Sequence, residues 1–176
     1  MTLKTCIEEM DLSTLSFAND ILRYLDEQEI SLIEPAKISS VDLSKVVGTT
    51  HINYRGKTWG GLKPVIGTSE GDISNIEVAC QPLKRAVTNI YALEKKPEYY
   101  LTMEEKDDWS FIELNGEFYI SEGNNRTVIG RFFLHLNDKP PIIHGVKVTT
   151  AIKKNGFHEV GKVKSVLLKI FRYLRV

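Results

Sequence analysis

The stretch that decides the fold is SEGNNRTVIGR, residues 121–131, where a predicted β-hairpin leads into a predicted helix. Before it, WSFIEL (109–114) and EFYIS (117–121) flank Asn115-Gly116. An Asn-Gly pair between β-rich runs is typical of a hairpin turn, because both turn positions need positive φ. After it, the helical spacing of apolar residues predicts a helix over 124–136, with these side chains inward: Val128, Ile129, Phe132, Phe133 and Leu136.

The residues at this corner suit an anion. Gly123 permits close backbone approach and positive φ. The first free amides of a helix, together with its dipole, favour negative charge. The side chains that follow add donors: Asn124 and Asn125 their amides, Arg126 a guanidinium able to bind a phosphate through two bonds, and Thr127 a hydroxyl. The alternative is ordinary helix capping, with Arg126 paired to Glu122 or another acid.

The composition is that of a globular protein, with 176 residues, 42% of them hydrophobic, and zero formal net charge. A neutral chain does not suit non-specific nucleic-acid binding as its main activity, because such binding comes largely from neutralising phosphates. The charge is unevenly distributed, however. Residues 1–48 hold four Lys or Arg and nine Asp or Glu, whereas residues 153–176 hold seven and one. Either the two ends are packed or solvated faces, or the basic end contacts nucleic acid or another anionic partner.

The cysteines and the N-terminus predict a cytoplasmic protein. Cys6 and Cys80 are far apart and match no metal-ligand spacing, so we expect two reduced thiols. The first residues, MTLKTCIEEMDLS, lack the basic-then-apolar layout of a signal peptide. No apolar run approaches the ~20 residues that a bilayer-spanning helix needs.

The remaining patterns predict an α+β fold in one domain over residues 1–176, a small mixed sheet packed against helices. We expect a helix over 12–29 with Leu15, Ala18, Ile21, Leu22 and Leu25 inward. The other expected elements are a short strand within 36–47, a long glycine-rich connection over 51–75, a helix over roughly 77–95, a strand over 142–152 and a basic amphipathic helix over 159–175.

The hairpin and corner, followed by PIIHGVKV (141–148), resemble the ParB/sulfiredoxin superfamily. Its members have a β-hairpin, an acidic residue and then Gly-x-x-Arg opening a helix, here Glu122, Gly123 and Arg126. The segment SVDLSKVVGTTHINYR (40–55) resembles the early box of that superfamily, a short strand leading to a polar, arginine-containing loop. Residues 44–51 and Arg55 match this loop, and the likeness covers roughly residues 37–150.

The resemblance implies a compact α+β fold in which the Gly-x-x-Arg box cradles the phosphates of ATP or CTP, usually with Mg²⁺. The superfamily includes sulfinic acid repair enzymes, CTP-switched DNA clamps, small-molecule kinases and nucleases, so a shared fold does not specify the function. Sulfiredoxins have a cysteine nucleophile where this chain has Asn124, which argues against sulfinic acid repair. Only about 25 residues follow the core, too few for the helix-turn-helix domain of partition ParB proteins. Asn125 stands where many members have histidine.

Two side chains are candidates for catalysis. Glu122 adjoins the predicted phosphate-binding site, where it could bind a metal ion, take a proton, or simply pair with Arg126. His51 lies in the early loop with Thr49, Thr50 and Arg55, and it could act as a base or an orienting group if that loop meets the corner. No metal-ligand cluster is visible from spacing. The sequence thus predicts nucleotide binding with NTPase or phosphotransferase activity; the alternatives are a nucleic-acid-binding or nuclease-type protein and an interaction module with a vestigial pocket.

Overall fold

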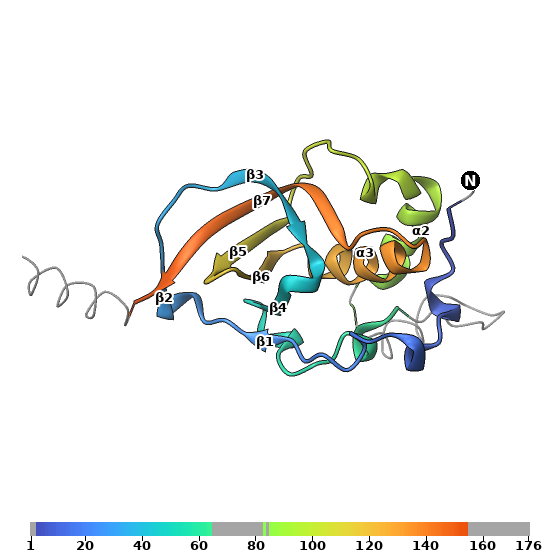
Figure 1. Cartoon of the computed structure of the whole chain (residues 1–176), viewed down its shortest axis with the longest axis horizontal. Coiled ribbons are helices and arrows are strands. Elements are labelled where there is room, and N and C mark those ends of the chain that lie inside the picture. Colours follow the sequence, from blue (N-terminus) through green and yellow to red (C-terminus); the bar gives the residue numbers. More distant parts are fainter. Residues whose placement is uncertain (1–2, 65–82, 84, 155–176) are drawn as a thin grey trace, which may run out of the picture.

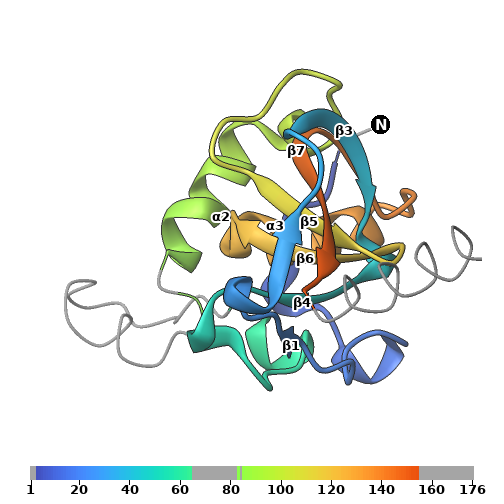
Figure 2. The same cartoon turned by 90° about the vertical axis from the view of Figure 1, so that its left-hand side faces the viewer.

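The computed structural model describes residues 3–64, 83 and 85–154, which form a curled mixed sheet with two α-helices at one end (Figures 1 and 2). The strand order is β1-β4-β6-β5-β7-β2, and β3 also pairs with β7. The strands are β1 (Arg23–Tyr24), β2 (Ile30–Leu32), β3 (Lys37–Asp42), β4 (Val46–Thr49), β5 (Ser110–Leu114), β6 (Glu117–Glu122) and β7 (Ile142–Lys153). The helices are α2 (Ala86–Lys95) and α3 (Asn124–Leu136). An α+β fold is therefore confirmed.

Short 3₁₀ helices connect these elements. They are η1 (Ile7–Glu9), η2 (Leu12–Thr14), η3 (Glu27–Glu29), η4 (Leu43–Lys45), η5 (Ile52–Tyr54), η6 (Gly60–Leu62) and η7 (Pro97–Tyr100).

The central hairpin and the helix after it are confirmed. β5 and β6 pair antiparallel up to Leu114 and Glu117. Between them, Asn115 and Gly116 have φ values of 56° and 80°, the positive angles that the Asn-Gly turn requires. α3 begins at Asn124 and ends at Leu136, as the apolar spacing predicts.

β7 organises the sheet, because its two edges pair with three strands. One edge runs parallel to β5. The other pairs antiparallel with β3 along its first part and with β2 along its last part. In Figure 1, β3 and β7 lie side by side along the upper rim of the sheet. Two strands from the N-terminal part of the chain thereby extend the sheet beyond the central hairpin.

Apolar side chains are buried in two clusters. The larger cluster joins α3 to the sheet and to residues from the first 62 positions; its members include Trp59, Trp109, Phe111, Phe132 and Phe133. The smaller cluster contains Leu25, Ile30, Ile112, Leu114, Tyr119 and Ala151. Phe111 and Ile112 are neighbours in β5 but belong to different clusters, as expected for a strand whose successive side chains point to opposite faces. Both faces of the central strands are therefore buried.

The predicted helix over 12–29 is wrong. This segment contains η2, β1 and η3 instead. The side chains of Asp11 and Asp26 accept hydrogen bonds from backbone amides two residues ahead, a local bond that competes with the α-helix. Backbone bonds to the segment after η5 also hold the chain, including Leu22 N to Lys57 O at 2.9 Å. Leu15, Ala18, Leu22 and Leu25 are buried as expected, but Ile21 is 61% exposed.

Several other predictions have mixed outcomes. The strand expected within 36–47 is present as β3, followed by η4 and the start of β4. The strand expected over 142–152 is β7. The helix expected over 77–95 is α2, which begins at Ala86. Residues 65–75 of the glycine-rich connection, the start of the helix expected over 77–95 with Cys80, and the basic tail over 159–175 lie outside the described residues. The predicted C-terminal helix and its nucleic-acid contact therefore stay predictions.

Lys106 secures the irregular segment between η7 and β5. Its side chain is almost fully buried, and its ammonium group donates to the carbonyls of Thr102, Glu104 and His144 at 2.8, 3.1 and 2.8 Å. Burial lowers the pKa of Lys106. The three carbonyls compensate the buried charge, because charge-assisted hydrogen bonds are about twice as strong as neutral ones. Lys106 therefore ties this segment to the start of β7.

We predict that Lys106→Met lowers the free energy of unfolding by about 2–3 kcal/mol, because the three carbonyls lose their shared donor while the side-chain volume is nearly kept. Urea denaturation measures this. Lys45→Met at an exposed position is the matched control, with an expected change within about 0.5 kcal/mol. Equal effects of the two substitutions would show that the Lys106 contacts do not stabilise the fold.

Candidate functional site

The corner between β6 and α3 is closely packed around Gly123. This residue is the N-cap of α3 and has φ of 83°, in the left-handed region. A Cβ atom here would lie 2.7 Å from Cδ1 of Trp109. Thr127, which is fully buried, donates its hydroxyl proton to the Gly123 carbonyl at 3.0 Å and accepts from the Trp109 ring N–H at 2.8 Å. The Thr127 hydroxyl therefore makes both of these hydrogen bonds with other groups of the protein.

The early loop meets this corner. β4 runs parallel to β6, so the two strands end at the same edge of the sheet. Beyond that edge, the buried Thr49 hydroxyl donates to Oδ1 of Asn124 at 2.8 Å. The backbone N–H of Thr50 donates to the Ile120 carbonyl at 2.9 Å, and that of His51 to the Thr49 hydroxyl at 3.0 Å. The structure thus brings together two segments separated by about 75 residues.

His51 and Asn125 both border Tyr54. The exposed His51 ring lies 5.1 Å from the Tyr54 ring, centroid to centroid, and its Nδ1 accepts from the Asn53 amide at 3.3 Å. In the neutral ring this bond places the proton on Nε2, which makes the outer edge of the ring a donor. Burial raises the pKa of Tyr54, and a hydrogen bond from the Asn125 side chain opposes this shift. Oδ1 of Asn125 is buried and has no hydrogen-bond partner among the described residues.

Arg126 is held by neutral oxygens. Its Nη1 donates to the Asp107 carbonyl at 2.8 Å and to the Tyr99 hydroxyl at 3.2 Å, and its Nη2 donates to the Asp108 carbonyl. The guanidinium carbon lies 5.4 Å from the centre of the Trp109 ring. These contacts anchor the segment before β5, and they replace the pairing with Glu122 that the helix-capping alternative offered. Because the acceptors are uncharged, the positive charge still acts on the surface of the corner.

Glu122 and Arg55 are exposed at different places. Glu122 ends β6, directly before Gly123, and is in register with Ser110. Arg55 lies over the Tyr24 ring at 5.8 Å, beside β1. Of the predicted site residues, the structure therefore assembles Thr49, Thr50, His51 and the segment 122–127, and it gives Arg55 a separate partner.

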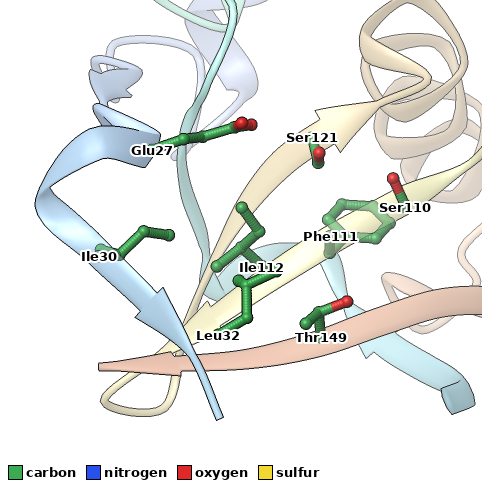
Figure 3. Close-up of a pocket in the computed structure, with 8 residues that line it drawn as sticks. All are labelled: Glu27, Ile30, Leu32, Ser110, Phe111, Ile112, Ser121 and Thr149. Carbon is green, nitrogen blue, oxygen red and sulfur yellow. The ribbon is translucent and has the colours of Figure 1, made fainter. Parts of the chain in front are cut away.

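A cavity of about 230 Å³ opens between η3, β2 and strands β5, β6 and β7 (Figure 3). Ile30, Leu32 and Ile112 form its apolar part, and the hydroxyl side chains of Ser110, Ser121 and Thr149 also line it, with the Glu27 carboxylate. Sequence reasoning missed this cavity. The available signal was the alternation of β7, which places a polar Thr149 on the same face as the buried Ala151.

Sequence reasoning also missed Tyr54 and Trp109, the two aromatic residues that pack against the corner. Among residues 3–64, 83 and 85–154, no group of three or more His, Cys, Asp or Glu could hold a metal ion. Within the same residues, no helix is long and apolar enough to cross a membrane. No family model, no curated protein and no solved structure matches this chain.

We predict that Gly123→Ala destabilises the protein more than Gly116→Ala does. Both glycines have φ near 80°, so both substitutions carry the left-handed penalty of about 1–2 kcal/mol. Only the Cβ at position 123 meets Trp109, since no atom lies within 4 Å of a Cβ at position 116. We expect a further loss of about 1–3 kcal/mol at position 123 from this overlap. Chemical denaturation of both variants measures the difference, and equal losses would contradict the packing described here.

Proposed function

We propose that this chain is a ParB/sulfiredoxin-like domain that binds a nucleoside triphosphate, ATP or CTP with Mg²⁺, at the N-terminal end of α3. The observation that carries the proposal is the buried hydrogen bond between Thr49 and Asn124. It joins the two segments whose sequences resemble the early and late boxes of that superfamily. A buried polar pair between distant segments is costly unless it is satisfied, so it specifies how the two segments meet.

The phosphates would bind the first turn of α3. The N-cap residue Gly123 supplies no side chain to the amides of that turn. Such amides have no acceptor within the helix, and the positive end of the helix dipole lies beside them. Arg126 adds a positive charge whose hydrogen-bond acceptors among the described residues are neutral oxygens. The corner therefore combines unpaired donors with positive potential, as phosphate binding requires.

Asn125 supplies a further donor. Within the described part of the chain its Oδ1 has no partner, while its side chain also forms a hydrogen bond with the Tyr54 hydroxyl. Turning the amide by 180° lets Oδ1 accept from that hydroxyl and brings the –NH₂ group to the unpartnered position. An amide donor then lies at the start of the helix, where a histidine stands in many members of the superfamily. In this orientation the Tyr54 hydroxyl satisfies Oδ1, and the –NH₂ group occupies the buried position that has no partner among the described residues.

A hydrolysis or transfer step would depend on exposed groups. Glu122 precedes the phosphate-binding site by one residue and is the acid placed to meet a nucleotide-bound Mg²⁺ or to take a proton. His51 would donate from Nε2 to a phosphate oxygen, since its Nδ1 accepts from the Asn53 amide. Asn124 is buried and bonded to Thr49, which accords with phosphate chemistry in place of a sulfiredoxin-type nucleophile at that position.

Isothermal titration with ATP, CTP and GTP in the presence of Mg²⁺ tests the proposal. We expect saturable binding of at least one of them, and we expect Asn125→Asp to weaken it at least about tenfold, because the new carboxylate repels the phosphates. An acid in the first turn of a helix is itself stabilising, so the variant should stay folded.

Asn115→Asp is the matched control. It makes the same change of charge at the tip of the β5–β6 hairpin, away from the corner, and we expect it to leave the affinity unchanged within about twofold. If no nucleotide binds to the folded protein, or if both variants weaken binding equally, nucleotide binding at this corner is wrong.

A further inference from the structure

A second cavity, of about 200 Å³, lies beside the C-terminal half of α3. It is lined by residues of the N-terminal segment, η4, α3 and the turn before β7. They include Ser16, Phe17, Ser44, Arg131, His135 and Lys139. The lining includes two cationic side chains, two hydroxyls and a histidine, and no acidic residue. This site is separate from the corner at the other end of the helix.

Arg131 is buried between two aromatic rings. Its side chain is only 6% exposed. The guanidinium carbon lies 4.1 Å from the centre of the Trp59 ring and 4.3 Å from that of the Phe17 ring. The two rings are perpendicular, with an angle of 88° between their planes, and cation–π contacts with both of them stabilise the charge. The N–H groups of Arg131 still need acceptors around the edge of the guanidinium plane.

The described residues satisfy the Arg131 charge poorly. Its Nη1 is buried without a hydrogen-bond partner, and Nη2 lies 3.8 Å from the Asp20 carboxylate, beyond hydrogen-bond distance. Asp20 is 62% exposed, so water screens this pair. Burial lowers the pKa of Arg131 to about 10, with Asp20 and Asp42 opposing the shift, and the group therefore stays protonated at neutral pH. A buried guanidinium with an unpaired donor is costly unless an acceptor completes it.

We infer that this cavity binds a small oxyanion, the phosphate or carboxylate group of a small molecule, with Arg131 and Lys139 as its cationic contacts. The Ser16 hydroxyl can donate to the same group, whereas the Ser44 hydroxyl already donates to the Asp42 carboxylate at 2.6 Å. Phe17 and Pro141 give the cavity an apolar wall, which suits a ligand with a small non-polar part next to its anionic group. An oxyanion supplies the acceptors that the buried guanidinium lacks, and Lys139 adds a second charge from the rim.

Titration of the full chain with inorganic phosphate, sulfate and acetate at low ionic strength tests the inference. Calorimetry gives the affinity, and the indole fluorescence of Trp59 reports on its contact with Arg131. Phosphate and sulfate are tetrahedral whereas acetate is planar, so their relative affinities distinguish a phosphate site from a carboxylate site. Neither Lys139→Gln nor Asp20→Asn disturbs a buried side chain, so both variants should fold.

The two variants should have opposite effects. We expect Lys139→Gln to weaken anion binding about fivefold, because it removes a cation from the lining. We expect Asp20→Asn to strengthen anion binding about threefold, because it removes the acid that competes for Arg131. Lys45→Gln is the matched control, next to Ser44 but outside the lining, and should change the affinity less than twofold. No saturable binding, or equal effects of Lys139→Gln and Lys45→Gln, or no gain from Asp20→Asn, would overturn the inference.

Discussion

The hydroxyl of Thr127 is the contact on which the arrangement of the molecule depends. It accepts from the Trp109 indole and donates to the Gly123 carbonyl, and so links the start of β5, the end of β6 and the first turn of α3. All of these groups are buried or half-buried, where hydrogen bonds are strong and an unpaired group is costly. The direction in which α3 leaves the sheet, and with it the larger hydrophobic cluster, is set at this point.

Two cations solve a related problem in the segment 102–109. This segment has no regular secondary structure, yet it crosses the end of the sheet beside buried aromatic rings. Lys106 donates hydrogen bonds to three carbonyls, and Arg126 donates to those of Asp107 and Asp108. Side chains here replace the backbone partners that a strand or helix would provide. Arg126 therefore stabilises this segment, a structural role that the sequence pattern did not reveal. Any ligand would share the Arg126 guanidinium with these carbonyls.

The predictable parts of the fold are those encoded over short distances. The Asn115-Gly116 turn and the spacing of Val128 to Phe133 are local signals, and the structure agrees with both. The predicted helix over 12–29 is wrong because backbone hydrogen bonds to residues 56–60 hold this segment and bury its apolar residues. The periodicity of a segment carries no information about such a distant partner. Within the candidate site, the sequence left open whether the early loop meets the corner, and the structure brings Thr49 against Asn124. The contact of Arg131 with the Trp59 and Phe17 rings joins three distant segments and had no signal in the sequence.

The two candidate anion sites lie on the same helix, α3, but they attract anions through different physical sources. At the N-terminal end of α3 the donors are backbone amides, whose availability follows from helix geometry whatever the side chains are. In its C-terminal half the helix dipole favours cations, and the attraction for an anion has to come from side-chain charge. Arg131 and Lys139 supply side-chain charge of that kind in and just after the last turns. A helix with basic side chains near its C-terminal end and free amides at its N-terminal end can therefore hold anions at both ends without either site weakening the other.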